Sequence, residues 1–288
     1  MRIDEQLTSG TAFLSTREET EEGCTFHPKG TAFFIGELLP KGRAINYVVT
    51  ARHVIDSTMP NGSLWVRCGS SGEQKRTLFE LPHDSWWLHP TTDIAVAPLS
   101  IPLEDYGLRF LPLGALANTE WIQEHDVGIG DRVIASGLFW QHIGQLGDAP
   151  MVRFGRIALV PEEPVRVSAQ GPLPSMEFPA ILVELGAWNG QSGSPVFVYF
   201  STDCDLFSGQ TPRTQIPNPR LLGILSGHHI ISQKISSLPG DPDNTPVPVN
   251  SGISVVVPAT GIFEVLAQDQ AVEFRSEFIR ILREAKLN

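Results

Sequence analysis

The sequence of 288 residues has little cysteine, few basic residues and no long hydrophobic run. Its 3 cysteines, Cys24, Cys68 and Cys204, are unevenly spaced, which excludes a disulfide framework and a zinc site and predicts buried or idle thiols in a reducing compartment. The 21 Lys and Arg residues are outnumbered by 32 Asp and Glu residues and form no cluster, so we expect neither a nucleic-acid nor a membrane partner.

Residues 1–20 lack the apolar stretch of a signal peptide, and no later segment approaches the roughly 18 apolar residues of a membrane span. Together with the cysteine pattern, this favours a cytoplasmic location. The adjacent histidines His228 and His229 could suggest a metal site, but neighbouring residues of a strand point to opposite faces and no third ligand lies near them. We therefore expect no metal and no cofactor.

Glycine and proline are plentiful, at 26 and 23 residues, and separate short runs rich in Val, Ile and Phe. This pattern is typical of strands joined by turns. The expected strands lie at residues 30–36, 44–54, 63–69, 77–90, 93–99, 131–139, 151–160, 179–185, 194–200, 220–227 and 252–259. Because about six fall in each half, we predict an all-β fold of two six-stranded antiparallel β-barrels followed by a C-terminal helix.

The predicted domains are an N-terminal β-barrel (1–116), a polar linker (117–128), a C-terminal β-barrel (129–259) and a helical segment (260–288). Two polar, Pro-containing stretches, 208–220 and 232–252, predict long surface loops in the second barrel. A helix face that packs on a barrel is indicated by apolar residues at helical spacing, namely Phe274, Phe278, Ile281 and Leu282.

Three short motifs supply the groups that acyl transfer by a serine requires: a nucleophile, an imidazole, a carboxylate and donors for the oxyanion. VVTARHV places His53 at a strand end, and TTDIAV places Asp93 directly before a strand, where a carboxylate needs a hydrogen-bond or ion-pair partner. In GQSGSP the glycines let the chain bend around Ser192, and the amides of Gly190 and Ser192 could donate to one oxygen. Each motif alone also fits a turn or a structural residue, but the three together indicate a catalytic triad.

The order of these residues along the chain separates the triad architectures. α/β-Hydrolases run Ser, acid, His and subtilisins run Asp, His, Ser, whereas this chain runs His53, Asp93, Ser192. From Gly30 to Ala259 the chain resembles the trypsin-like (chymotrypsin-fold) serine peptidases. TARH, TTDIAV and GQSGSP match the histidine, aspartate and serine boxes of that family, and GILSG and GISVVVP resemble the two strands that follow the serine.

The resemblance implies a serine endopeptidase that cleaves proteins or peptides through an acyl-enzyme. His53 would be the general base, Asp93 its orienting partner and Ser192 the nucleophile. The amides of Gly190 and Ser192 would form the oxyanion hole. Ser226 matches the serine that supports the buried aspartate and precedes the strand that pairs with substrate.

The chain departs from the secreted digestive members at the residue before the serine. There they carry an aspartate that pairs with an N-terminus released from a precursor, whereas this chain carries Gln191 and has no IVGG-like start. Activation by insertion of a new N-terminus is therefore not expected. The resemblance is closest to bacterial trypsin-like peptidases and the HtrA/Deg branch, and we expect no PDZ domain after Ala259.

The family also indicates where the specificity pocket lies. Its floor precedes the serine, which points to Leu185, Gly186 and Ala187, while Gly227 and His228 lie on the substrate-pairing strand. Because the floor carries no acidic residue, we predict a small or apolar side chain at the cleaved position (P1). The alternative left open is that His228 favours an acidic or amide side chain.

A function of another class also fits the sequence: a latent or pseudo-enzymatic trypsin-fold module that acts as a regulatory or binding scaffold. No ion pair with a released N-terminus can hold residues 190–193 in this chain. We therefore hypothesise that the long loops, oligomer contacts or a regulatory protein partner set the activity.

Overall fold

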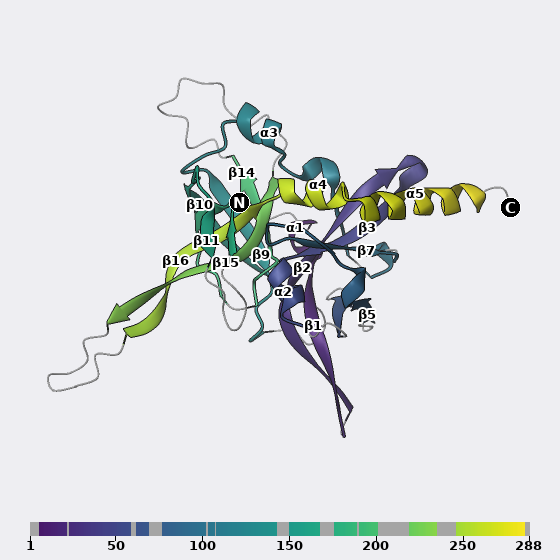
Figure 1. The fold of residues 1–288 in the computed structure, drawn as a ribbon, viewed down its shortest axis with the longest axis horizontal. Coiled ribbons are helices and arrows are strands. Elements are labelled where there is room, and N and C mark those ends of the chain that lie inside the picture. The colour runs from purple at the N-terminus through teal and green to yellow at the C-terminus, as the bar shows by residue number, and fades with distance from the viewer. Residues whose placement is uncertain are drawn as a thin grey trace.

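The computed structural model describes residues 6–21, 23–58, 62–68, 77–101, 103–106, 108–142, 150–167, 176–188, 190–200, 219–234 and 246–285. A large β-sheet lies beside a closed β-barrel, and two helices follow the last strand (Figure 1). The helices are α1 (Gln6–Ser9), α2 (Arg52–Asp56), α3 (Thr119–Glu124), α4 (Thr260–Leu266) and α5 (Asp269–Glu284). Short 3-10 turns lie at Pro40–Gly42, His83–Ser85, Leu103–Tyr106 and Leu113–Ala115.

The first sheet contains eight strands and follows the order β5-β4-β1-β2-β3-β7-β6, with β8 added on β2. All pairs are antiparallel except β2 with β8. Its strands are β1 (Thr11–Thr20), β2 (Gly23–Leu39), β3 (Arg43–Thr50), β4 (Ser63–Cys68), β5 (Thr77–Pro82), β6 (Trp87–Leu88), β7 (Ala95–Leu99) and β8 (Leu111–Pro112).

The second sheet closes into a barrel in the order β10-β13-β16-β15-β14-β9. Its strands are β9 (Arg132–Gly137), β10 (Met151–Leu159), β13 (Ile181–Glu184), β14 (Pro195–Tyr199), β15 (Arg220–Lys234) and β16 (Pro246–Pro258). A separate pair is formed by β11 (Val165–Val167) and β12 (Met176–Phe178). The all-β class with a C-terminal helix is confirmed, and the second unit is the six-stranded barrel that the sequence predicted.

The first unit differs from its prediction because it is a curled sheet of eight strands. The sequence predicts no strand before residue 30, but β1 pairs with β2 along its whole length. Only the first half of β1 is buried, and its second half is polar and exposed, so the alternating pattern of a half-buried strand is missing. The β1–β2 hairpin extends away from the body (Figure 1).

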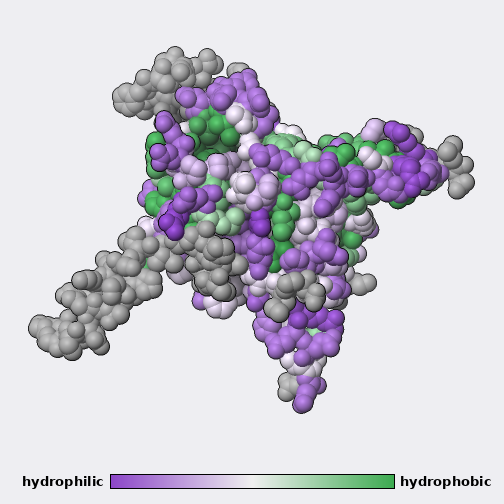
Figure 2. Space-filling view, in the orientation of Figure 1, coloured by the Kyte–Doolittle hydropathy of each residue, from purple (hydrophilic) through white to green (hydrophobic). Residues whose placement is uncertain are grey.

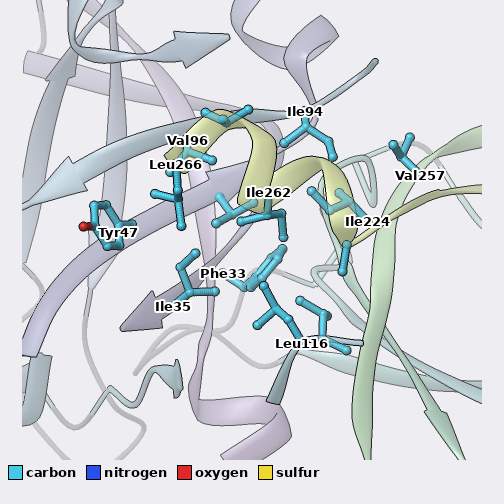
Figure 3. Packing of buried hydrophobic residues seen from close by; sticks show 14 of the residues in the cluster. Phe33, Ile35, Tyr47, Ile94, Val96, Leu116, Ile224, Val257, Ile262 and Leu266 are labelled. Carbon is cyan, nitrogen blue, oxygen red and sulfur yellow. The ribbon is translucent and has the colours of Figure 1, made fainter. Parts of the chain in front are cut away.

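One apolar cluster joins the two units and α4. Phe33 and Tyr47 come from the first sheet, Ile224 from the barrel, and Ile262 and Leu266 from α4 (Figure 3). All five are at most 4% exposed. Because close packing of this kind resists small shifts, side chains from both units can meet in a fixed geometry.

The helix α5 packs over part of its length only. Phe274 and Phe278 lie against the central cluster, and Phe274 contacts Trp87 edge-on at 5.7 Å between ring centroids. Ile281 is 51% exposed, so the predicted apolar face does not pack as far as that residue. Hydrophobic and hydrophilic residues both reach the surface of the projecting part of α5 (Figure 2). No helix in the described ranges is long and apolar enough to cross a membrane.

The predicted loop 232–252 is largely strand at its two ends. β15 continues to Lys234 and β16 begins at Pro246, and the two pair antiparallel as far as these residues. The regular pairing with a neighbouring strand outweighs the Pro and polar content that indicated a loop. Residues 201–218 and 235–245, which contain the middle of both predicted loops, lie outside the described residues.

Candidate active site

His53 lies near the start of a short helix and not at the end of a strand. Strand β3 ends at Thr50, and α2 begins at Arg52 after one extended residue. Val54 and Ile55 are buried and fix α2 on the sheet, whereas the His53 side chain keeps 32% of its surface exposed. The imidazole is therefore held by a packed helix and is still reachable from solvent.

Asp93 is 1% exposed, and its carboxylate accepts three hydrogen bonds. The His53 backbone N–H donates to Oδ1 (2.8 Å), the His53 Nδ1–H donates to Oδ2 (2.7 Å), and Ser226 Oγ donates to Oδ2 (2.5 Å). These bonds satisfy a carboxylate that would otherwise be costly to bury. Because Nδ1 carries the proton of the neutral ring, Nε2 is the nitrogen that can accept another.

The pKa of His53 lies above its ordinary value of 6.5. Burial by itself lowers this pKa, but the charge of Asp93 and its hydrogen bond to the ring outweigh the effect of burial. The charge of Asp56 acts in the same direction as Asp93. His53 is therefore a stronger base than a free imidazole, which suits it to take a proton from a hydroxyl.

Ser192 lies in a tight loop between two glycines with left-handed backbone conformations. Gly190 has φ +89° and Gly193 has φ +88°. A Cβ added to Gly193 would also collide with the carbonyl oxygen of Thr31 and the hydroxyl of Thr50. Position 193 therefore needs glycine both for its backbone angle and for space.

Strand β2 and the barrel both hold this loop through hydrogen bonds. The Thr31 N–H donates to the Ser192 carbonyl (2.8 Å), and Thr31 Oγ1 donates to the Gly190 carbonyl (2.9 Å). On the barrel side, the Gly193 N–H donates to the Leu225 carbonyl (2.8 Å). The position of Ser192 thus depends on both units of the fold.

Gln191 closes the same loop from within. It is 2% exposed, and its Oε1 accepts a hydrogen bond from the Trp188 N–H (3.2 Å). Its own backbone N–H donates to the Trp188 carbonyl (3.2 Å). An uncharged amide therefore braces the loop at the position where the digestive members carry an aspartate. Asn189, the first residue of the NGQSGSP stretch, lies outside the described residues.

The loop offers two backbone N–H groups as hydrogen-bond donors, whereas the hydroxyl of Ser192 is already hydrogen-bonded. The backbone N–H groups of Gly190 and Ser192 donate to no acceptor within the described part of the chain. The Ser192 hydroxyl donates to the Ser226 carbonyl (3.2 Å), and among the described residues no hydrogen bond joins it to His53. Acyl transfer therefore requires this hydroxyl to leave the Ser226 carbonyl and turn toward Nε2, as is common in the absence of substrate.

A pocket of about 560 Å³ lies beside the loop. Of the predicted pocket residues, Gly186, Ala187 and His228 line it, whereas Leu185 is 2% exposed and packs in the barrel core. Leu185 directly follows β13 and continues its alternation, with Val183 and Leu185 both buried. Gly227 is not among the lining residues.

The pocket has lining residues that the sequence analysis did not anticipate. Phe139 and Trp140 follow strand β9, and Arg153 lies on β10. Arg153 shares one face of β10 with Gly155 and the buried Ile157, since alternate residues of a strand face the same way. This alternation was the available signal that Arg153 points inward. Nothing in the sequence showed what it would meet there.

The pKa of His228 lies below 6.5, because burial and the neighbouring His229 both disfavour its protonated form. His228 is therefore neutral near pH 7. Within the described part of the chain, no three His, Cys, Asp or Glu side chains gather to hold a metal ion. Cys24 is free and exposed rather than buried, and Cys204 lies outside the described residues.

Helix α4 supports the segment that carries Asp93. His89 is 2% exposed, and its Nδ1 accepts hydrogen bonds from the backbone N–H groups of Thr91 and Thr92, so its Nε2–H donates to Glu264 (2.9 Å). Gly261 lies so close to this segment that an added Cβ would come within 2.6 Å of Ile94. The C-terminal helix thus fixes the chain immediately next to the buried carboxylate.

The sequence of this chain was compared with those of known protein families. The sequence pattern of the trypsin-like peptidase domain matches residues 30–199, which is more than half of the chain and includes the histidine, aspartate and serine motifs. The chain belongs to the trypsin-like peptidase domain family. It is therefore a trypsin-fold protease, and its substrates are proteins or peptides. A search of curated protein sequences finds no match.

Two solved structures are similar to this trypsin-like peptidase. It is similar to the protease domain of MamO from Magnetospirillum magneticum (apo form), with 12% identity, a TM-score of 0.50 and coverage of 91% of this chain and 98% of that chain. It is also similar to an inactive mutant form of Rv3671c from M. tuberculosis H37Rv, with 15% identity, a TM-score of 0.42 and coverage of 90% and 85%. The likeness to MamO shows a chymotrypsin-like fold and nothing about activity.

Proposed function

We propose that the protein is a serine endopeptidase that cleaves peptide bonds through an acyl-enzyme. One observation carries this proposal: the buried Asp93 joins His53 and Ser226 through hydrogen bonds. The carbonyl of the same Ser226 accepts the hydroxyl of Ser192. The base and its orienting carboxylate are thus hydrogen-bonded to each other, and both the carboxylate and the Ser192 hydroxyl are hydrogen-bonded to the same residue, Ser226, at positions that match the family motifs.

The geometry supports the following sequence of steps. Nε2 of His53 takes the proton of the Ser192 hydroxyl as Oγ forms a bond to the carbonyl carbon of the substrate. The substrate carbonyl oxygen, which becomes negatively charged, accepts hydrogen bonds from the N–H groups of Gly190 and Ser192. His53 then gives the proton to the leaving amine as the peptide bond breaks. In the second half of the reaction, His53 takes a proton from water as the water oxygen attacks the acyl carbon, and then returns that proton to Ser192 Oγ as the acid product leaves. Asp93 stays ionised throughout and stabilises the imidazolium.

A second candidate, a latent trypsin-fold module, is favoured by one observation. The Ser192 hydroxyl is bound to the Ser226 carbonyl, a contact that withholds it from His53. If this contact persists when substrate is bound, the site cannot acylate. A partner that moves residues 190–193 would then switch the protein on.

Mass spectrometry after reaction with a fluorophosphonate probe tests the proposal. We expect one covalent adduct on Ser192 in the wild-type protein and none in Ser192→Ala, because only an activated serine attacks the phosphorus. An adduct on another residue would contradict the assignment. A folded wild-type protein with no adduct would favour the latent module.

The rate of this labelling should depend on pH through His53. Only the neutral imidazole accepts a proton, so labelling should fall as the pH drops through the pKa of His53, with a midpoint above 6.5. The same shift implies that the His53–Asp93 pair stabilises the folded protein fully below pH 6.5 and that this contribution is lost as the pH rises through the raised pKa. Labelling rates and the histidine NMR titration, measured from pH 5 to 9, check the first statement, and urea unfolding over the same pH range checks the second. A midpoint below 6.5 would show that Asp93 does not hold the protonated ring.

A further inference from the structure

Arg153 brings an unmatched positive charge to the pocket beside Ser192. The residue is half-buried on β10 and lines the pocket. Its Nη1 donates to the carbonyl of Gly186, and its guanidinium lies over the ring of Trp188 at 5.8 Å from the centroid. Its Nε is buried and has no hydrogen-bond partner. A guanidinium carries five N–H donors, and among the described residues the only acceptor for a hydrogen bond from Arg153 is the Gly186 carbonyl.

No carboxylate among the described residues lies within ion-pair distance of Arg153. Other arginines of this acidic protein do have such partners: Arg52 pairs with Asp56, and Arg275 pairs with Glu37. Burial lowers the pKa of Arg153, but an arginine remains charged at neutral pH. A partly desolvated guanidinium at the wall of a pocket, with no carboxylate partner among the described residues, favours an anion that enters the pocket from outside the chain.

The pocket lies where a substrate side chain next to the cleaved bond would enter. A Cβ on Gly190, whose N–H is an oxyanion donor in the proposed function, would lie 3.6 Å from Trp140. Trp188 is hydrogen-bonded to Gln191 in the same loop. His228 lies on the same strand as Ser226, two residues further along. The aromatic rings of Trp140 and Trp188 would cover the aliphatic part of a side chain while its end reaches Arg153.

We propose that Arg153 binds the carboxylate of a glutamate or aspartate side chain at P1, so that the protein cleaves after acidic residues. This inference rests on the proposed function for its site of cleavage. A planar carboxylate matches the fork of a guanidinium, and a lysine or arginine at P1 would be repelled. His228 lies in the same pocket, but it is neutral near pH 7 and cannot supply this charge. The proposal departs from the expected small or apolar P1 residue and takes up the acidic alternative.

Matched fluorogenic peptides that differ only at P1 test the inference. We expect kcat/KM for the Glu peptide to exceed that for the Gln peptide by about 10- to 100-fold, the range of a hydrogen bond to a charged group. Arg153→Met should abolish this ratio, and Arg153→Lys, which keeps the charge without the fork, should retain part of it. Arg156→Met is the matched control, because Arg156 is exposed on the same strand and binds the Gly130 carbonyl outside the pocket. It should leave the ratio unchanged.

A binding measurement separates this inference from the proposed function. In the Ser192→Ala background, peptides that end in Glu, Gln or Ala are titrated while tryptophan fluorescence is followed. The Glu peptide should bind about 10-fold or more tightly than the Gln peptide, and Arg153→Met should remove the difference. Equal binding, or equal cleavage of the Glu, Gln and Ala peptides, overturns the inference even if the probe labels Ser192. Selective binding of the Glu peptide by a protein that the probe never labels would sustain the pocket and overturn the peptidase function.

Discussion

Asp93→Asn is expected to lower kcat for peptide cleavage by about 10⁴-fold, the loss typical of an amide in place of the orienting carboxylate. The side chain of Asp93 meets three donors, two from His53 and one from Ser226. An amide has only one acceptor oxygen, so its NH₂ group must face one of these donors. If it faces Nδ1 of His53, the imidazole must adopt the other tautomer, with its proton on Nε2. Steady-state kinetics on one good peptide substrate, at a pH well above 6.5, measure the loss.

Ser226→Ala is the control for Asp93→Asn. It removes one hydrogen bond to the same buried carboxylate and leaves the His53 Nδ1–H bond in place. We expect a loss of about 10-fold, in the range of one hydrogen bond to a charged group. Thermal unfolding shows whether each variant is folded. A folded Asp93→Asn protein with activity within a factor of ten of wild type would remove Asp93 from the mechanism.

Gly193→Ala is expected to lower the free energy of unfolding by about 2 to 5 kcal/mol, the sum of left-handed strain and overpacking. The backbone angle of +88° is unfavourable for alanine. The new methyl group would also collide with the Thr31 carbonyl and the Thr50 hydroxyl, both of which are buried. Because the loop cannot move without carrying Ser192 away from its place, probe labelling should fail as well. Urea unfolding and labelling are measured on the same samples.

Gly130→Ala separates strain from collision. Gly130 also has a left-handed angle, φ +95°, but an added Cβ would meet nothing within 4 Å. The free energy of unfolding of this variant should fall only by the cost of the left-handed backbone, about 1 to 2 kcal/mol, and the probe should label it normally. If the two alanine variants are equally stable, the space around residue 193 is larger than the structure indicates.

The residues proposed as a triad could be singled out from the sequence because each lies in a short motif that can be recognised locally. The glycines around Ser192 and the position of Asp93 before a buried run are properties of a few consecutive residues. The barrel of the second unit was predictable for a similar reason, since its strands are short apolar runs separated by turns.

Other features could not be predicted because they depend on contacts between distant parts of the chain. Thr31 holds the Gly190 carbonyl from another sheet, and no local pattern marks it. The alternation along β10 indicates that Arg153 points inward, but its hydrogen bond to the Gly186 carbonyl depends on how the barrel closes. Strand β1 was missed because half of it pairs only with β2 in solvent, where burial does not impose an alternating pattern.

The order in which the ribosome produces these elements has a consequence for the cell. The strand that carries Thr31 and the residues His53 and Asp93 emerge first, whereas the Ser192 loop that they complete emerges much later. Helix α4, which fixes the chain beside Asp93, emerges later still. A nascent chain that does not yet include these elements therefore holds an incomplete candidate site. The candidate site can therefore assemble only after both units and α4 have been synthesised and have packed together.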